Sequence, residues 1–374
     1  MLTLLRDAEV FAPERLGRQD VLIAGERIVA IAPRLPAFPP NLARELDLAG
    51  RIVIPGLIDA HVHVTGGGGE AGPGSRVAPL LFTTLAAAGV TTVVGVLGTD
   101  GTTRTIASLV ARTLGLRQEG LSAFCYTGSY ELPLQTLTGS VRKDMVFVDP
   151  IVGVGELAIS DHRSSQPTLD ELLRIASDVH VGGMMSGKAG LLHLQLGDGT
   201  RGLDLVRRAL DTSELPPRVF HPTHINRQRR LFDEALELAA RGVTVDVTAF
   251  PPGPLEDPGL SAVDAIERYL ASGAPRDRLT CSSDGGGCLP VFDADGRMTS
   301  MDVGRPTTLL DTIRELVARG RSLEDVLPAF TTNVASLFRF ARKGRIAAGS
   351  DADLVVLGPD LRVTEVMARA VWVV

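Results

Sequence analysis

Two histidines separated by one residue stand at the end of an apolar segment near the start of the chain. His61 and His63 lie within the segment 57–64, and Asp59 precedes His61 by two positions. If the segment is a β-strand, side chains two apart point to the same face, so both imidazoles could reach one cation. Two histidines without a ligand near a loop are the plainer alternative. The chain has only seven histidines, which favours a metal site.

Two further candidate ligands stand where later apolar segments end. His224 ends the segment 219–224, and Asp284 follows the segment 279–283 and precedes three glycines. A buried carboxylate needs a partner, and a metal ion is a common one. The alternative for Asp284 is a turn-capping role, with the glycines supplying only backbone freedom. Each residue alone is a weak signal, but four such groups at three strand ends together predict a metal centre.

Eight short apolar segments alternate with amphipathic helical segments over the middle of the chain. Continuous Val, Ile and Leu runs are typical of parallel strands that helices cover on both faces. We expect strands at 57–64, 92–97, 122–127, 151–159, 191–196, 219–224, 243–247 and 279–283, and helices at 77–88, 106–118, 169–179, 203–212, 231–241 and 262–271. This pattern has the size of a (β/α)8 TIM-like barrel, an α/β fold in which strand ends converge at one mouth. A doubly wound sheet is the alternative, but the chain lacks both nucleotide-binding glycine motifs that would support it.

Both ends of the chain consist of short strands and turns without a helix. We expect a hairpin of 20–24 with 27–31, a second hairpin of 46–48 with 51–54, and strands at 352–357 and 363–374. The two ends together predict a small β-sandwich domain of residues 1–54 and 345–374. The (β/α)8 barrel domain would then comprise residues 55–344.

The composition excludes several other classes of protein. The 374 residues are 44% hydrophobic, which allows a large core, and 44 acidic against 38 basic residues give a net charge of −6. A chain without a basic excess is a poor candidate for binding nucleic acid, and no apolar run reaches the roughly 18 residues of a membrane helix. Three cysteines cannot form a disulfide framework, so we expect a cytoplasmic protein that acts on a small molecule.

Longer motifs make the chain similar to a known group of enzymes. The segments 55–63 and 349–354, with the strands at both ends, resemble the amidohydrolase superfamily. A more specific similarity, to the isoaspartyl dipeptidase family, lies in the stretches 61–73, 94–100, 138–140, 159–164, 222–227 and 282–285. This resemblance implies hydrolysis of the β-aspartyl (isoaspartyl) peptide bond in dipeptides by a metal-activated water. It also implies one or two Zn²⁺ ions per chain and a homo-oligomer.

The resemblance assigns roles to the candidate ligands. His61 and His63 would hold a first zinc ion together with Asp284, and His224 would be a ligand of the second. Asp284 would also accept the proton of the attacking water and pass it to the leaving amine. This division of labour is chemically reasonable because zinc lowers the pKa of water toward neutrality. Tyr130 matches a tyrosine that polarises the scissile carbonyl, and a half-buried loop tyrosine is the alternative.

Substrate selection, by the same resemblance, depends on charged groups. Glu70 would hold the free α-amino group of the substrate, and Arg163 and Arg227 would hold its carboxylates. The planar fork of arginine suits this task because it binds a carboxylate through two hydrogen bonds. Gly68 and Thr99 match positions that line the same pocket. A solvated surface position is the alternative for each arginine.

Three positions depart from the family pattern. Glu156 stands where the family has a carboxylated lysine that bridges two metals, and Gln195 stands where it has a histidine ligand. A glutamate can bridge cations although its side chain is about three bonds shorter, whereas a glutamine amide is a weak zinc ligand. His193 could replace Gln195 only if the strand slipped by two residues. Cys288 replaces a serine near the substrate carboxylate and is a poorer hydrogen-bond donor.

Three functions are therefore compatible with the sequence. The first is a metal-dependent isoaspartyl dipeptidase in which Glu156 bridges the metals. The second is an amidohydrolase that acts on another N-acyl amino acid or amide. The third is a metal-poor, non-catalytic paralogue that binds acidic peptides. The presence of Glu70, Arg163 and Arg227 favours the first.

Overall fold

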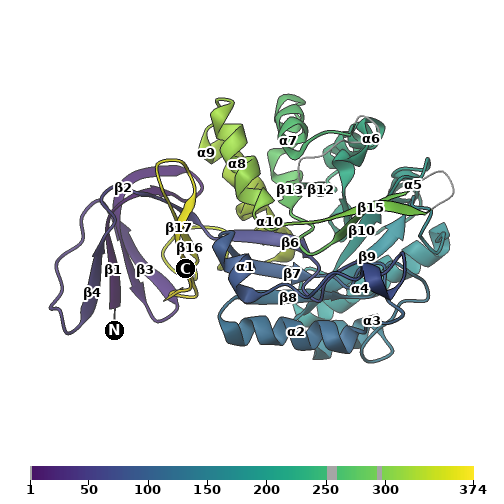
Figure 1. Ribbon diagram of the computed structural model, residues 1–374, viewed down its shortest axis with the longest axis horizontal. Helices are drawn as coiled ribbons and strands as arrows, with labels where there is room; N and C mark the ends of the chain where they lie inside the picture. The colour runs from purple at the N-terminus through teal and green to yellow at the C-terminus, as the bar shows by residue number, and fades with distance from the viewer. Residues whose placement is uncertain (1, 251–258, 293–296) are drawn as a thin grey trace.

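Both ends of the chain contribute strands to one sheet, which lies beside a larger α/β unit (Figure 1). The computed structural model describes residues 2–250, 259–292 and 297–374. The sheet has eight strands in the order β18-β17-β16-β5-β1-β2-β3, with β4 paired to β1. These strands are β1 (Leu2–Phe11), β2 (Arg15–Ala24), β3 (Arg27–Ala32), β4 (Ala43–Asp47), β5 (Ile52–Pro55), β16 (Leu354–Leu357), β17 (Val363–Ala368) and β18 (Val371–Trp372). Leu5, Val53 and Leu354 belong to the small core of this sheet.

Of the two hairpins expected near the start of the chain, the structure confirms the first. β2 and β3 pair antiparallel around a turn between Ala24 and Arg27. The second is wrong, because β4 and β5 do not pair with each other but both run parallel to β1. The physical reason is the length of β1, whose first half pairs with β4 and whose second half pairs with β5. A register irregularity between Leu5 and Ala8 in its pairing with β2 lies between these two halves.

The α/β unit is built on parallel strands. Six of them form one sheet in the order β11-β10-β9-β8-β7-β6, and β12 pairs with β13 in parallel. They are β6 (Leu57–Val62), β7 (Val90–Gly95), β8 (Ser122–Thr127), β9 (Ile151–Ile159), β10 (Leu191–Leu196), β11 (Phe220–Thr223), β12 (Val245–Thr248) and β13 (Leu279–Ser282). An isolated parallel bridge between Val62 and Gly285 places the chain after β13 beside β6. All eight expected strands are present, and β8, β9 and β10 have the expected bounds.

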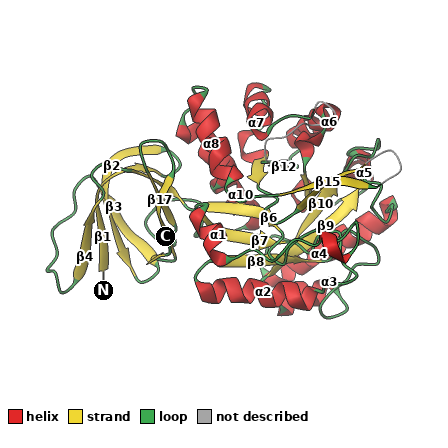
Figure 2. Ribbon diagram, viewed as in Figure 1, coloured by secondary structure: helices red, strands yellow, loops and turns green. Residues whose placement is uncertain are grey.

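Helices follow the parallel strands along the chain and lie on their outer side (Figure 2). They are α1 (Phe82–Ala87), α2 (Ile106–Glu119), α3 (Val141–Phe147), α4 (Leu169–Ser186), α5 (Asp204–Thr212), α6 (Arg229–Ala240), α7 (Ala262–Ala271), α8 (Thr308–Ala318), α9 (Leu323–Val326) and α10 (Thr332–Phe338). α4 shows why these helices begin and end where they do. Thr168 and Glu171 form a capping box at its start, and Gly187 ends it in the left-handed conformation.

Short elements complete the chain between the helices and strands. Single 3-10 turns lie at Pro73–Ser75, Pro217–Val219, Ile225–Arg227, Arg276–Arg278 and Leu327–Phe330. The antiparallel pair β14 (Cys288–Phe292) and β15 (Met298–Val303) follows β13. The sequence did not lead us to expect this pair, α3 or the helices α8 to α10.

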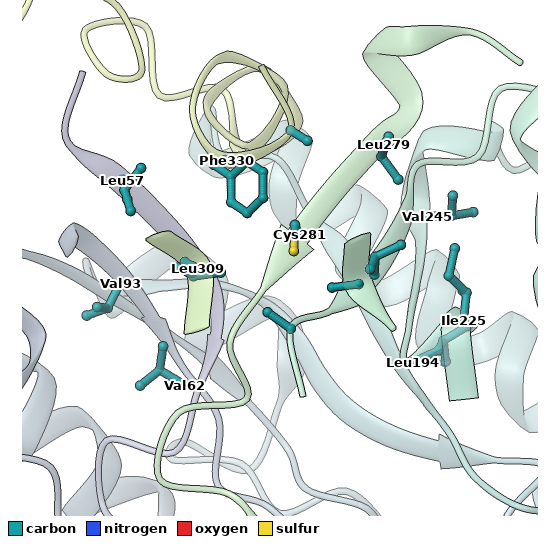
Figure 3. Packing of buried hydrophobic residues seen from close by; sticks show 14 of the residues in the cluster. Leu57, Val62, Val93, Leu194, Ile225, Val245, Leu279, Cys281, Leu309 and Phe330 are labelled. Carbon is teal, nitrogen blue, oxygen red and sulfur yellow. The ribbon is translucent and has the colours of Figure 1, made fainter. Parts of the chain in front are cut away.

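A continuous apolar core fills the space between the parallel strands and their helices. Phe330, Leu57 and Cys281 belong to it and are fully buried (Figure 3). The strand residues that supply this core alternate with residues that face the inside of the curved sheet. Among the described residues, no helix is both long and apolar enough to cross a membrane. The strands pack into this apolar core, and this packing fixes the positions of their ends and of the polar side chains described next.

Candidate metal and substrate site

The two histidines at the end of β6 meet the aspartate that follows β13. The Oδ1 atom of Asp284 lies 3.0 Å from Nε2 of His63 and 3.5 Å from Nε2 of His61. The backbone amide of His63 donates to the carbonyl of Gly285 at 2.8 Å, which ties the two strand ends together. The structure thus brings together the three residues that the sequence predicts as one metal group.

Glu156 extends from β9 toward the same two histidines. Its Oε2 lies 3.3 Å from Nε2 of His61, and its Oε1 lies 3.4 Å from Nε2 of His63. The register of β9 with β10 shifts here, so that Gly155 and Glu156 together face His193. Such a bulge redirects a side chain, and it brings the shorter glutamate within reach of the site. The sequence left open whether the short side chain of Glu156 could reach the two histidines, and this register shift brings it there.

His224 completes a second ligand group. One of its ring nitrogens lies within 4.8 Å of ligand atoms of His61 and Glu156. Its Nδ1 hydrogen-bonds Thr248 Oγ1 at 2.7 Å, which leaves Nε2 for a ligand. His224 adopts a left-handed backbone conformation with φ of 61° directly after β11. This strained position is typical of functional sites.

Asp59 lies behind these ligands and connects the same two strands. Its Oδ1 accepts from the backbone amide of Ser283 at 3.1 Å and from that of His61 at 3.3 Å. Its Oδ2 accepts from the Ser283 hydroxyl. Burial raises the pKa of Asp59 to about 7, against the opposing effect of these donors. Asp59 is therefore a structural link between β6 and the chain after β13.

The electrostatics of the ligand group are those of a site that needs a cation. Burial alone would lower the pKa of His61, but the Glu156 and Asp284 carboxylates outweigh it and raise this pKa to about 9. Burial would raise the pKa of Asp284, yet the neighbouring imidazoles of His63 and His61 hold it below its ordinary value. Burial, helped by the Arg227 charge, holds the pKa of His224 well below its ordinary value. Two carboxylates thus face three imidazoles with little access to water.

The unpaired atoms of this group fit a divalent metal ion. His61 Nε2, both carboxylate oxygens of Glu156 and Asp284 Oδ1 are buried and have no hydrogen-bond partner among the described residues. A buried acceptor without a donor is costly, and a metal ion would satisfy all four atoms at once. Imidazole nitrogens and carboxylate oxygens are also the donors that zinc takes.

Beside the ligand group lies a cluster of charged and polar residues that the sequence predicts as the substrate site. Glu70 Oε1 accepts from the Thr99 hydroxyl at 2.8 Å and lies 3.6 Å from Arg163 Nη1. Its other oxygen, Oε2, is buried and lacks a hydrogen-bond partner in the described part of the chain. Burial and the nearby Glu70 carboxylate raise the pKa of the Cys288 thiol to about 12, so Cys288 is a neutral group. Glu70 and Arg163 therefore lie together with two weaker hydrogen-bond donors, Thr99 and Cys288.

Arg163 is held in this cluster by a partner that the sequence analysis missed. Asp161 accepts from Arg163 Nε at 3.0 Å and from Nη2 at 2.7 Å. It also accepts from Gln195 Nε2 at 2.6 Å. Gln195 therefore uses its amide nitrogen to hold Asp161, while its Oε1 has no hydrogen-bond partner among the described residues. The only sequence signal for this link is the acid two positions before the arginine.

The glycine-rich loop after β6 passes close to the same cluster. Gly68 has φ of +76°, and a side chain there would lie 2.3 Å from the Ser75 carbonyl. The buried Arg104 donates to the carbonyls of Gly67 and Gly68 at 2.7 and 2.8 Å. Arg104, which the sequence analysis did not select, thus fixes the shape of the loop that precedes Glu70.

Tyr130 and Arg227 flank this group. The ring of Tyr130 is buried, and the guanidinium of Arg163 lies over it at 5.5 Å from the ring centre. Burial and the Glu156 charge raise the pKa of Tyr130 well above its ordinary value, so its hydroxyl stays protonated and can donate. The guanidinium of Arg227 lies over the ring of Phe250, 5.7 Å from its centre. Its positive charge opposes the rise in the pKa of Tyr130 and helps to lower the pKa of Asp284. The predicted site residues therefore surround one region.

His193 does not take the place of the missing ligand. Its Nε2 lies 2.7 Å from Nδ1 of His61, on the side of that ring away from the carboxylates. β10 pairs with β11 in regular register, with His193 opposite His221. His193 is thus a neighbour of a ligand, and the described residues place no histidine where Gln195 stands.

Comparisons with known proteins agree with this geometry. Residues 52–373 match the model of the amidohydrolase family. The structure resembles that of a beta-aspartyl dipeptidase from Fervidobacterium islandicum AW-1 in complex with a beta-Asp-Leu dipeptide, with 42% identity, 100% of this chain and 96% of that chain covered, and a TM-score of 0.94. A second structure of beta-aspartyl dipeptidase from the same organism gives 40% identity, the same coverage and a TM-score of 0.90. An allantoinase from Streptomyces avermitilis is 27% identical over 96% of this chain and 86% of its own length.

Proposed function

Because this chain belongs to the amidohydrolase family and, within it, to the isoaspartyl dipeptidases, we propose that it hydrolyses the β-aspartyl peptide bond of dipeptides with the help of a bound metal ion. The observation that carries this proposal is the full-length similarity to a beta-aspartyl dipeptidase that was solved with beta-Asp-Leu. The charged cluster of Glu70 and Arg163 beside the metal-ligand group supports it.

The proposal includes a (β/α)8 barrel of residues 55–344 and a small β-sandwich domain of residues 1–54 and 345–374. The eight parallel strands and the bridge between Val62 and Gly285 support the barrel. The eight-stranded sheet built from both chain ends supports the second domain. In this arrangement the metal ligands lie at the carboxyl ends of the strands, where barrel enzymes carry their active sites.

We assign the metal site to His61, His63, Glu156, His224 and Asp284, with zinc as the ion. Zinc, when bound, supplies a Lewis acid that makes water nucleophilic near neutral pH. Glu156 faces both histidines of β6 and suits a bridging role if two ions bind. A second ion would have only a weak ligand from β10, because the group that Gln195 offers is an amide oxygen. We therefore expect fewer than two tightly bound zinc ions per chain.

The residues of the chain supply the remaining chemistry. Asp284 has a lowered pKa and is ionised, so its carboxylate can accept a proton from the attacking water and return it to the leaving amine. Tyr130 has a raised pKa, so its hydroxyl can donate to the oxygen of the scissile carbonyl, where negative charge develops. Neither group has to change its charge before substrate binds.

The charges of the cluster match those of an isoaspartyl dipeptide. The free oxygen of Glu70 suits the α-amino group, and Arg163 and Arg227 suit the two carboxylates. Gly68, Thr99 and Cys288 complete the lining, and Thr99 orients Glu70 by a hydrogen bond. An ordinary α-linked dipeptide carries the amine and the carboxylates at other distances, so the cluster should select the β-linkage.

The test is hydrolysis of β-Asp-Leu by zinc-replete protein, compared with α-Asp-Leu and with N-acetyl-leucine. We expect a clear preference for β-Asp-Leu. Glu70→Gln should lower kcat/KM for this peptide by at least about 30-fold, because an unpaired buried charge costs roughly 2 kcal/mol or more. A wild-type preference for N-acetyl-leucine would instead favour an amidohydrolase of another specificity. A zinc-replete protein that hydrolyses none of the three would contradict the enzymatic function.

A further inference from the structure

From the metal ligand His61, buried polar side chains form a continuous series of hydrogen bonds across five strands. Nδ1 of His61 lies 2.7 Å from Nε2 of His193, and Nδ1 of His193 lies 2.9 Å from Nδ1 of His221. Nε2 of His221 lies 3.0 Å from the hydroxyl of Thr280, which donates to Oδ1 of Asp246 at 2.6 Å. Every member of the series is fully buried.

Both ends of this series impose the same direction on its hydrogen bonds. At one end, both oxygens of Asp246 accept from hydroxyl groups, so Thr280 donates to it and must itself accept from His221 Nε2. At the other end, a metal ligand needs a free lone pair on Nε2, so the proton of His61 stands on Nδ1 and is donated to His193.

The middle of the series then has one arrangement. His193 accepts on Nε2 and therefore carries its proton on Nδ1, which donates to Nδ1 and to the backbone carbonyl of His221, at 2.9 and 3.1 Å. His221 accepts on Nδ1 and carries its proton on Nε2, which is the atom that faces Thr280. With a metal ion on Nε2 of His61, all three imidazoles are thereby neutral, and no donor meets a donor. Burial lowers the pKa of His221 to about 4, which agrees with a neutral ring.

The packing leaves these rings little freedom to turn. The ring of His193 stacks on that of Tyr126, with centres 4.9 Å apart and an angle of 3° between their planes. The backbone of Gly155 is also close, since a Cβ atom there would lie 2.7 Å from Cβ of His193. The ring orientation is therefore set by the backbone and by neighbouring side chains as well as by the hydrogen bonds.

We propose that His193, His221, Thr280 and Asp246 act as a positioning array that fixes the orientation and tautomer of His61 and strengthens its binding to the metal ion. The proposal rests on the metal site of the proposed function, and it assigns a role to residues that touch neither metal nor substrate. In metalloproteins, a carboxylate that receives the other ring N–H of a ligand histidine makes that ligand more basic. Here the carboxylate acts through two further imidazoles and a hydroxyl.

Zinc affinity, measured by competition with a chelator, is the readout that tests the array. His193→Leu removes the acceptor of His61 and should weaken zinc binding by about 10- to 100-fold, as loss of such a partner does in other sites. His193→Gln, whose Oε1 can take the place of Nε2 as acceptor, should restore much of this loss. Thermal unfolding of the metal-free variants shows whether each one is folded.

A matched pair of distant variants separates the array from general packing. Thr280→Val cuts the series between His221 and Asp246, whereas Thr223→Val removes the hydrogen bond of 2.7 Å that Thr223 donates to the other oxygen of Asp246. Both replace a buried threonine by an isosteric residue next to the same carboxylate. We expect Thr280→Val to weaken zinc binding by about tenfold, the lower end of the same range, and Thr223→Val to leave it close to wild type.

The outcomes distinguish this proposal from the proposed function. Equal zinc affinity of both threonine variants, or wild-type affinity of a folded His193→Leu protein, would refute the array. If the wild type hydrolyses β-Asp-Leu in a zinc-dependent way in those experiments, the proposed function stands without it. A wild type that binds no zinc would overturn both the metal site and the array.

Discussion

Replacing Asp161 by asparagine tests whether the position of Arg163, which we propose binds the substrate, depends on the buried carboxylate of Asp161. The side chain of Asp161 accepts from Arg163 Nε and Nη2 and from Gln195 Nε2, at 3.0, 2.7 and 2.6 Å. In the variant Asp161→Asn, one oxygen becomes an NH2 group that faces two donors. Gln195 can turn its amide to present the oxygen, but the guanidinium of Arg163 has no acceptor to offer.

The expected loss follows from the one hydrogen bond that Arg163 cannot recover. A hydrogen bond to a charged group contributes about 1.5–3 kcal/mol. At 1.4 kcal/mol for each factor of ten, kcat/KM for β-Asp-Leu should fall by about 10- to 150-fold. Arg163 Nη1 already lies 3.6 Å from Glu70, so the released guanidinium should move toward that acid. The loss should therefore appear mainly in KM, while zinc content stays constant.

The assay is steady-state kinetics with β-Asp-Leu together with zinc analysis of each protein. Asp198→Asn is the matched control, because Asp198 is an exposed aspartate nearby whose Oδ2 lies 2.8 Å from Nδ1 of the exposed His162. The control should keep wild-type kinetics. If a folded, zinc-loaded Asp161→Asn protein also keeps wild-type kcat/KM, then Arg163 either does not depend on Asp161 or does not bind the substrate.

The ion pair of Asp161 and Arg163 should also make the free energy of unfolding depend on pH in the acidic range. Burial would raise the pKa of Asp161, but the hydrogen bonds and charge of Arg163 hold it below the ordinary 3.8. A carboxyl whose pKa is lower in the folded state stabilises it above the ordinary pKa, and this contribution disappears as pH falls through the lowered value. Urea denaturation of wild type should lose it below about pH 4, and Asp161→Asn should lack this component.

Three further predictions concern the framework of the site. Gly155→Ala should weaken zinc binding by about tenfold or more, because the new Cβ atom would lie 2.7 Å from Cβ of His193. Gly115→Ala on α2 is the control and should not change zinc affinity. Equal zinc affinities of the two variants, measured by chelator competition, would contradict the role of the bulge. Lys188→Met should lower the free energy of unfolding in urea by about 2–4 kcal/mol, because Lys188 Nζ donates to three backbone carbonyls at 2.8 Å. Lys143→Met, on an exposed side chain, is its control and should have no such effect. Removal of metal with EDTA should lower the unfolding temperature, and added zinc should restore it, since a ligand of the native state stabilises that state; an unchanged temperature would argue against a bound ion.

The parallel strands were predictable from the sequence because each is a short run of apolar residues between polar or glycine-containing turns. β8, β9 and β10, buried along nearly their whole length, begin and end where expected. The pair β14 and β15 was not predictable in the same way. β14 contains Pro290 and follows three glycines, and β15 is largely exposed, so neither gives the apolar pattern on which the prediction depends.

The candidate ligands His61, His63, His224 and Asp284 were predictable because each stands within two residues of a strand end, and the strand ends of a parallel sheet meet at one edge. Their supporting contacts were not, because these depend on distances between residues far apart in the chain. Gln195 and Asp161 are 34 positions apart, and His193 and His61 are 132 apart. The bulge that directs Glu156 toward the histidines is likewise a property of the pairing of two strands, which neither strand reveals alone.

The pairing of β5 with β16 has a consequence for the order in which the protein can fold during synthesis. β5 ends at Pro55 and β16 begins at Leu354, so about 300 residues must be translated before the second edge of β5 finds its partner. At about 5–20 residues per second, this edge waits roughly 15–60 s on the ribosome. β5 is largely buried in the finished protein, so the nascent chain exposes an apolar, unpaired strand for that time. Such an edge can pair with other chains, and the nascent chain is therefore most prone to aggregation while the α/β unit is being synthesised.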